Sequence, residues 1–268
     1  MLCTLTLFGL QASADNIVVT GADIDFNYEF DPSGAAEQAL LAMATFAMNG
    51  SSLPVLTFDH FSELDDALSD LGISYVNIDP DGFIDPSVFD PTVYSAIMVA
   101  SDQSCGGCDN DSLSASNLAA LEPQIAAFAA GGGGIVALAG GTDPQYYDFL
   151  PFGVNILSGS ESVTGYYQTA FGASLIPTPG SLGVPAINGY STPNFFSSPG
   201  VDGTDPAWQV VSALQIGDSP DSSVDPAVTL AIGSTQGPSE GTVPEPSAFL
   251  LVGSGLLSLG LRRRVVRG

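Results

Sequence analysis

The chain has 268 residues, 45% of them hydrophobic, and it carries 29 acidic residues against four basic ones. Apolar residues at that density exclude a disordered chain and suffice for one sizeable core. The basic residues are all arginines between Arg262 and Arg267, and Glu245 is the one acidic residue outside residues 15–243, so that segment has a formal charge of −28. It repels nucleic acid and attracts cations, which excludes a nucleic-acid-binding protein.

Residues 1–14 have the pattern of a signal peptide. The stretch from Leu2 to Leu10 is largely apolar, and Ala12-Ser13-Ala14 supplies the small residues that signal peptidase selects. A buried first strand is the alternative. We expect signal peptidase to be a partner and the exported domain to cover residues 15–232.

Strand and helix signals alternate along the first half of the exported domain. Amphipathic segments predict helices that begin at Asp31-Pro32, follow Ser62 and cover roughly residues 113–130. Short apolar or β-branched runs predict strands at residues 17–19, 54–58, 74–78, 95–100 and 135–139. This alternation predicts an α/β fold with a doubly wound, mostly parallel sheet.

The helix boundaries carry more specific predictions. Asn49-Gly50 is expected to end the first helix. Ser62 is the predicted N-cap of the second helix, because Asp65 follows three residues later as in a capping box. Pro123 either kinks the third helix or marks its true start.

The residues from Tyr94 to Gly140 resemble a known family. They comprise a strand that ends at Ser101-Asp102, a polar loop, a helix, and the run Gly131-Gly132-Gly133-Gly134 before an apolar strand. This order is similar to the middle of the class I glutamine-amidotransferase-like fold. The resemblance extends over roughly residues 16–155 and implies the scaffold of that family.

The catalytic residues of that family are missing from the matching positions. In active members, the turn after the strand that corresponds to residues 134–139 carries a cysteine nucleophile, and a histidine and an acid follow later. Here that turn reads Gly140-Gly141-Thr142-Asp143, and the single histidine, His60, lies far upstream. The resemblance therefore implies a scaffold without the activity, and the remaining candidates for an unrecognised catalytic site are His60, Asp102 and Thr142.

From about residue 153 the chain becomes richer in glycine, proline, serine and threonine. Its apolar stretches are short, as at residues 208–214 and 227–232. This composition predicts a β-rich, loop-rich C-terminal portion of the same domain, followed by a flexible linker over residues 233–242.

Cys105 and Cys108 are the cysteines that remain once the signal peptide is removed. In an oxidising compartment they pair most simply with each other, so a structural disulfide is predicted. Redox catalysis and metal ligation are the alternatives. The acidic residues Asp109 and Asp111 follow the motif and disfavour a reactive thiolate.

Three aspartates, Asp79, Asp81 and Asp85, partly resemble a calcium-binding loop. Carboxylates alternate before Gly82, which permits a sharp turn, but the pattern lacks the glutamate that ends an EF-hand loop. Solvated turn residues are the alternative. No cofactor is predicted, and calcium is the alternative.

Aromatic residues cluster at Tyr146, Tyr147 and Phe149 and again at Tyr166 and Tyr167. Because aromatic rings stack on the apolar faces of sugars, these residues either line a sugar-binding surface or pack inside the core. The sequence leaves both interpretations open.

The last 26 residues combine three elements. Pro244-Glu245-Pro246 is followed by the uncharged, mostly apolar residues 248–261 and by Arg262-Arg263-Arg264. A helix of that length spans about 21 Å, so it makes a short transmembrane segment with its arginines on the cytoplasmic side. The tail, residues 243–268, resembles the PEP-CTERM sorting signal of exported bacterial proteins, which implies processing by the membrane peptidase exosortase. An uncut membrane anchor is the alternative.

Together these observations predict an exported, exosortase-processed protein of the cell surface or extracellular matrix of a Gram-negative-type bacterium, held transiently in the inner membrane. The sorting family implies a non-catalytic role, with exopolysaccharide as a candidate contact. The alternatives are an amidotransferase-like hydrolase with an unrecognised site and a calcium-dependent adhesion module.

Overall fold

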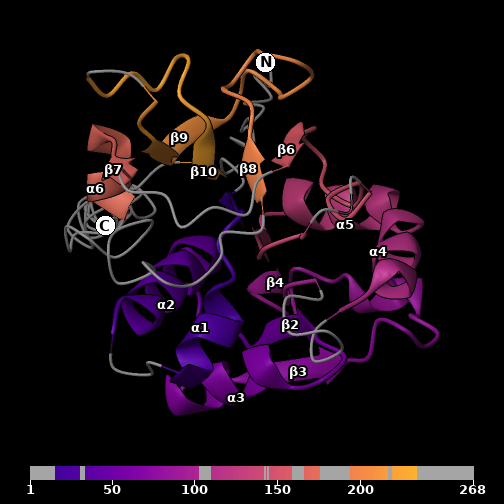
Figure 1. Ribbon diagram of the computed structural model, residues 1–268. Helices are drawn as coiled ribbons and strands as arrows, with labels where there is room; N and C mark the ends of the chain where they lie inside the picture. Colours follow the sequence, from indigo (N-terminus) through magenta and orange to yellow (C-terminus); the bar gives the residue numbers. More distant parts are fainter. Residues whose placement is uncertain are drawn as a thin grey trace, which may run out of the picture. The chain divides into compact units, whose positions relative to one another are not determined.

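The computed structural model describes residues 16–30, 34–102, 110–141, 143, 145–158, 166–175, 194–216 and 219–233 (Figure 1). All of them belong to the compact unit that ends at Thr235. The predicted signal peptide and the sorting tail lie outside the described residues. None of the helices in the described ranges is long and apolar enough to cross a membrane.

A ten-stranded sheet runs through the described part of the chain, and half of it is parallel. The parallel strands lie in the order β3-β2-β4-β5-β1. Their bounds are β1 (Ile17–Thr20), β2 (Val55–Phe58), β3 (Tyr75–Ile78), β4 (Ala96–Val99) and β5 (Gly134–Ala137). The five strands predicted for the first half are confirmed. Four of them are buried throughout, whereas β3 lies at the edge of the sheet and is partly exposed.

Helices cover both faces of this parallel half, as in a doubly wound sheet (Figure 1). On one face lie α1 (Ile24–Phe30), α2 (Ala35–Met48) and α3 (Glu63–Asp70). On the other lie α4 (Ser112–Ala119), α5 (Glu122–Ala130) and the 3-10 helix η1 (Pro86–Val88). Successive strand residues alternate between the two layers, so Met98 packs in the first and Ile97 and Val99 pack in the second.

The helices differ from the predictions at several points. Helix α1 has no counterpart among the predicted helices, and α2 follows Gly34, whereas the predicted start at Asp31-Pro32 lies outside the described residues. The long third helix is two helices, and Pro123 lies in the first turn of α5, so the proline marks a start. The predicted end of α2 is confirmed, since Asn49 adopts the left-handed conformation with φ of 49°.

The remainder of the sheet is antiparallel, so the sheet is mixed and not mostly parallel as predicted. β10 pairs with β1, and β8 and β9 both pair with β10. No helix is described between β8, β9 and β10, and a parallel pair needs a long crossover connection. The bounds of this β-rich portion are β6 (Ile156–Ser158), β7 (Tyr166–Gln168), α6 (Ala170–Leu175), β8 (Asn194–Phe196), β9 (Gln209–Leu214) and β10 (Ala227–Ile232).

The aromatic cluster after β5 belongs to the core. Tyr146, Tyr147 and Phe149 are 1%, 4% and 0% exposed. The Tyr147 hydroxyl accepts a hydrogen bond of 2.8 Å from the backbone N–H of Gly140. For these three residues the interpretation as a sugar-binding surface is wrong, because their rings have no face open to a ligand.

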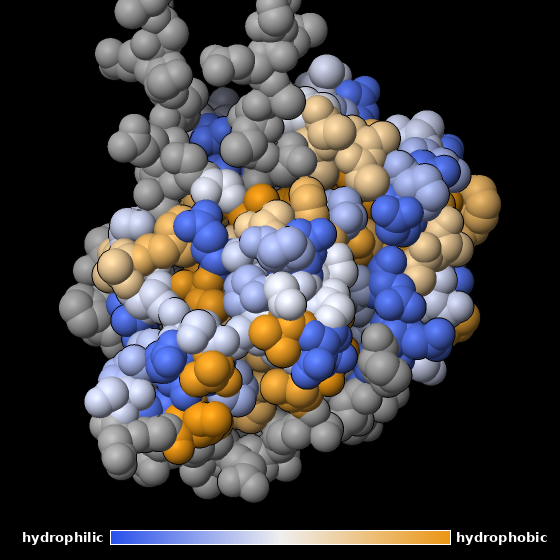
Figure 2. All heavy atoms as spheres, turned by 90° about the horizontal axis from the view of Figure 1, so that it is seen from above, coloured by the Kyte–Doolittle hydropathy of each residue, from blue (hydrophilic) through white to orange (hydrophobic). Residues whose placement is uncertain are grey.

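The surface is mixed in character. On the face shown in Figure 2, hydrophobic residues form separate patches among hydrophilic ones. Three large hydrophobic side chains that are exposed, Phe61, Phe83 and Leu113, lie in segments that follow β2, β3 and β4. These segments share one edge of the sheet.

At that edge, the connections that follow neighbouring strands turn toward opposite faces of the sheet. The chain leaves β2 toward α3 on one face of the sheet and leaves the neighbouring β4 toward α4 on the other. Such a divergence opens a crevice at the carboxyl ends of the strands, where open α/β sheets bind ligands. The segments after β2, β3 and β4 meet there.

We predict that Gly134→Ala destabilises the fold. A Cβ atom at Gly134 would lie 2.1 Å from the backbone oxygen of Ala47, so β5 and the end of α2 must separate. The expected loss is about 1–3 kcal/mol of unfolding free energy, the usual cost of overpacking, measured by urea denaturation. Gly82→Ala is the matched control, because its Cβ would lie 3.4 Å from the backbone oxygen of Asp79. Equal stability of the two variants would contradict the prediction.

Candidate functional site

Asp59 organises the segment that follows β2. Its Oδ1 accepts hydrogen bonds from the backbone N–H groups of Phe61 (3.0 Å) and Ser62 (2.9 Å), and its Oδ2 accepts one from Asp65 (3.1 Å). Ser62 occupies the N-cap position with φ of 85°, but its side chain makes no capping bond. The predicted capping box is therefore wrong, because Asp59, three residues earlier, satisfies the free N–H groups at the start of α3.

Two asparagines, the exposed Asn77 and the buried Asn110, fix the same segment from its sides. Asn77 of β3 donates from Nδ2 to the backbone oxygen of Asp59 (3.0 Å). Asn110, which precedes α4, accepts from the backbone N–H of His60 (3.1 Å) and donates to the backbone oxygens of Phe58 (3.0 Å) and Ala100 (3.2 Å). The ends of β2, β3 and β4 are thus tied together directly beneath His60.

The turn after β3 is fixed just as closely. Asp79 Oδ1 accepts from the backbone N–H of Asp81 (3.0 Å). Ser114 of α4 donates from its hydroxyl to Asp81 Oδ1 (2.6 Å), and Asn117 donates from Nδ2 to the backbone oxygen of Pro80 (2.8 Å). One oxygen of the Asp81 carboxylate is therefore anchored, and the other faces His60.

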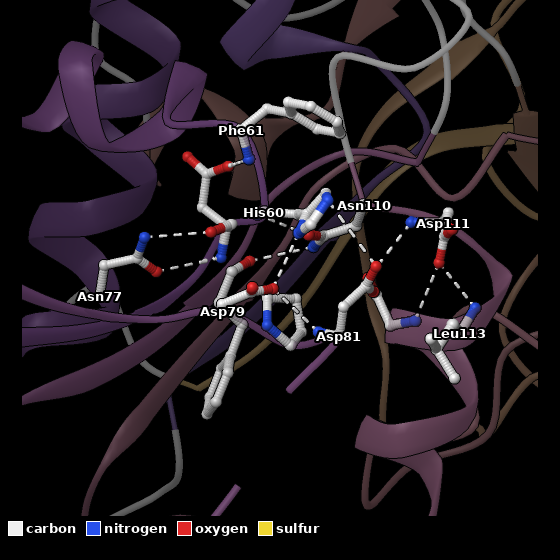
Figure 3. Close-up of polar contacts among 12 residues, drawn as sticks. His60, Phe61, Asn77, Asp79, Asp81, Asn110, Asp111 and Leu113 are labelled. Atoms are coloured by element: carbon white, nitrogen blue, oxygen red, sulfur yellow. Dashed lines mark hydrogen bonds and ion pairs between the residues drawn. The ribbon is translucent and has the colours of Figure 1, made fainter. Parts of the chain in front are cut away.

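His60 lies between two carboxylates (Figure 3). Its Nδ1 is 2.8 Å from Asp79 Oδ1, and its Nε2 is 3.7 Å from Asp81 Oδ2. The hydrogen bond to Asp79 raises the pKa of His60, and the nearby charges of Asp81 and Asp111 act in the same direction. The same bond lowers the pKa of Asp79. The side chain of His60 is 29% exposed, so the cluster is open to solvent.

This cluster has the composition of a metal site. Among the described residues, His60, Asp79 and Asp81 form the group of three metal-ligating side chains whose ligand atoms lie within 4.8 Å of one another. A distance of 3.7 Å between Nε2 and Oδ2 is too long for a hydrogen bond. Two atoms that bind one metal ion are commonly separated by about that much, because each lies roughly 2.1 Å from the ion.

The structure places the other predicted site residues elsewhere. Asp85 Oδ1 accepts from the backbone N–H of Ser87 (2.9 Å) at the start of η1, and His60 takes the third place in the cluster. The carboxylate of Asp102 lies near Gly141, where a Cβ would be 3.5 Å from Asp102 Oδ2. Four predicted features lie outside the described residues: Thr142, the pair Cys105 and Cys108, the Pro244-Glu245-Pro246 box, and the arginine cluster Arg262-Arg263-Arg264.

Sequence reasoning did not identify Asn77, Asn110 or the role of Asp59. One signal was available, since Asn77 interrupts an otherwise apolar strand. Asn110 stands between two aspartates in a polar loop and carries no comparable signal.

The comparison with known families concerns the tail. Residues 242–264 match the family model of the PEP-CTERM protein-sorting motif. This match defines the class, an exported protein that is sorted through its C-terminal signal. The chain therefore carries a PEP-CTERM sorting signal, and this signal implies processing by exosortase. No curated protein and no solved structure matches the chain, so the amidotransferase-like resemblance stays a prediction.

Asp65 lies beneath the site with an unusual environment for a carboxyl group. It is 5% exposed, and its Oδ1 accepts a hydrogen bond of 2.6 Å from the Thr57 hydroxyl. Burial raises the pKa of Asp65 from 3.8 to about 6, and the charges of Asp59 and Asp66 add to the effect. The difference corresponds to roughly 3 kcal/mol against the ionised form.

We predict a stability change with pH that Asp65→Asn removes. The folded protein holds the proton of Asp65 more tightly than the unfolded chain does, so the protonated carboxyl adds to the free energy of unfolding. This contribution is complete below about pH 3.8 and is lost as the pH rises through 6. Above that range the variant should gain roughly 3 kcal/mol relative to the wild type, as measured by urea denaturation between pH 4 and 7. Asp148→Asn, at an exposed aspartate whose charge does not act on Asp65, should keep the wild-type profile. Parallel profiles for wild type and Asp65→Asn would contradict the assignment.

Proposed function

We propose that this exported protein is a non-catalytic, metal-binding protein of the cell surface or extracellular matrix. The observation that supports it is the orientation of His60, whose Nδ1 faces Asp79 while its Nε2 lies 3.7 Å from Asp81 Oδ2. Small movements of the two side chains let one ion bind both Nε2 and Oδ2. Export delivers the site to the outside, where cations are available in solution.

The ligand types favour Zn²⁺ or a related transition ion over calcium. Calcium takes six to eight oxygen ligands, whereas imidazole nitrogen suits zinc, copper and nickel. In this arrangement His60 and Asp81 bind the ion, and Asp79 accepts the Nδ1–H and orients the ring, as outer-shell carboxylates commonly do. Water completes the coordination. A calcium site formed by Asp79, Asp81 and Asp85 is the alternative from the sequence.

The environment of His60 supports a binding role over catalysis. Both ring nitrogens face carboxylates of the protein, so neither nitrogen is directed at a substrate as a general base must be. The side chain of Asp102, another catalytic candidate, lies near Gly141 after β5. The amidotransferase-like hydrolase is the second proposal, and it depends on a site that includes Thr142.

Exposed rings beside the cluster support a polysaccharide as the partner. Phe61 is 48% exposed and its ring meets that of His60 edge to face, with centroids 4.3 Å apart. Phe83, two residues after Asp81, is 89% exposed. Sugar hydroxyls can complete the coordination of an ion while the sugar faces pack on aromatic rings. Exopolysaccharide of the matrix is therefore the proposed contact.

We expect Zn²⁺ to bind the purified protein with one site that calcium does not displace. Asp79→Asn should lower the affinity about 10- to 100-fold, the usual effect of losing an outer-shell partner, and His60→Ala should abolish binding. Isothermal titration calorimetry measures both. Asp85→Asn is the matched control, because the Asp85 carboxylate caps η1. The Zn²⁺ affinity of this variant should equal that of the wild type. Loss of binding in Asp85→Asn, or displacement of Zn²⁺ by calcium, would favour the calcium loop.

We expect the mature chain to start at Asp15 and to end near Pro244. Intact mass of the protein from membrane and medium fractions, before and after reduction and alkylation, tests both ends. Cys105 and Cys108 should be alkylated only after reduction, because they form a disulfide. A variant in which Pro244 and Pro246 are alanine should keep its tail. A wild-type chain that extends through Gly268 would identify a plain membrane anchor.

A further inference from the structure

The metal site proposed at His60 is incomplete within one chain. His60 Nε2 and Asp81 Oδ2, 3.7 Å apart, are the two atoms available to an ion, because Asp79 is engaged by Nδ1 on another side of the ring. Among the residues that the structure describes, no further metal-ligating side chain joins this group. Zinc takes four ligands in structural sites. One chain therefore leaves half of a tetrahedral site open.

The open half of the site faces outward. The side chains of His60 and Asp81 are 29% and 21% exposed. Both are held in place, since the Ser114 hydroxyl donates to Asp81 Oδ1 (2.6 Å) and the backbone N–H of His60 donates to Asn110 Oδ1 (3.1 Å). An ion between the two ligand atoms would thus lie at the surface, within reach of ligands from another molecule.

Large exposed hydrophobic side chains lie in the segments that carry this site. Phe61, Phe83 and Leu113 are 48%, 89% and 51% exposed. The ring of Phe61 contacts the imidazole of His60, and Figure 3 shows the cluster between Phe61 and Leu113. A polar site with an apolar rim is typical of a surface that binds another protein.

Charge and size make association at this surface depend on the ion. The segment 15–243 has a formal charge of −28, so two copies without metal repel each other. Three side chains, at no more than roughly 250 Å² each, do not reach the ~800 Å² per partner of a stable interface. One Zn²⁺ placed between two copies offsets the charges of two Asp81 carboxylates, while each His60 binds as the neutral ring.

We propose that one zinc ion joins two copies of this chain through their His60 clusters, an inference that rests on the proposed metal site. Each copy contributes His60 Nε2 and Asp81 Oδ2, and the hydrophobic rims pack around the ion. The two copies are then related by a two-fold axis, with the same surface used on both. A second copy suits the open positions because it supplies imidazole and carboxylate, the ligand types that zinc selects. A polysaccharide would use the same positions, so each site holds one or the other.

The test is sedimentation velocity of the mature, processed protein during titration with zinc chloride. We expect the dimer fraction to be greatest at one ion per two chains. It should fall in excess zinc, because each chain then holds its own ion with water. EDTA should return the protein to monomers. Added sodium chloride should strengthen the zinc dimer, since salt screens the repulsion between the two copies.

Two variants separate the rim from the ion. Phe83→Ser should weaken the zinc dimer about 10-fold or more, because both copies lose a ring, while calorimetry in excess zinc shows unchanged binding of the ion to each chain. Val93→Ser is the matched control, since Val93 is 45% exposed but precedes β4 at the opposite edge of the sheet. It should dimerise like the wild type.

The possible failures are distinguishable. Zinc bound by every chain without a dimer at any ratio would overturn the proposal and leave the metal site in place. Absence of zinc binding would overturn both. A dimer that persists in EDTA, or one that Val93→Ser weakens as much as Phe83→Ser, would show association away from the His60 cluster and also overturn the proposal.

Discussion

The absence of lysine and arginine before residue 262 constrains the rest of the structure, because no carboxylate in the exported domain can form an ordinary salt bridge. Buried carboxylates are instead satisfied by neutral donors. Asp59 accepts three backbone N–H groups, and Asp25 accepts from the backbone N–H and the hydroxyl of Ser101. Asp225 accepts from the backbone N–H groups of Ile216 and Asp221 and from a tyrosine hydroxyl. Each such carboxylate holds a loop or a helix end in place, which gives the acidic composition a structural role.

The sheet decides where this chemistry is concentrated. Parallel pairing places the carboxyl ends of β2, β3 and β4 side by side, and the chain then leaves β2 and β4 toward opposite layers. Asn77 and Asn110 use the resulting space to connect neighbouring strand ends through their amides. The single histidine is held there by its backbone, and its ring meets two carboxylates from the turn after β3. The fold therefore gathers the single histidine and its two carboxylate partners at the edge where ligands bind in this class of sheet.

The proposed metal site uses part of the acidic charge. At His60, a nitrogen and carboxylate oxygens converge on one point, which suits a single small ion. The exposed ring of Phe61 contacts the imidazole of His60 edge to face, so an aromatic surface lies beside the site. A protein of this charge, delivered outside the cell, meets such ions in solution.

The sequence alone determined the features that depend on residues close to one another in the chain. The sorting motif at 242–264 is read from contiguous residues, and the strands and most helices follow from the spacing of apolar side chains. Tertiary structure alone decided the pairing of β10 with β1, which makes the sheet mixed, and the replacement of Ser62 by Asp59 as the cap of α3. It also decided that His60 joins Asp79 and Asp81 although about twenty residues separate them, while Asp85 turns to η1. Periodicity records which side of an element is buried, but it does not record which distant element covers that side.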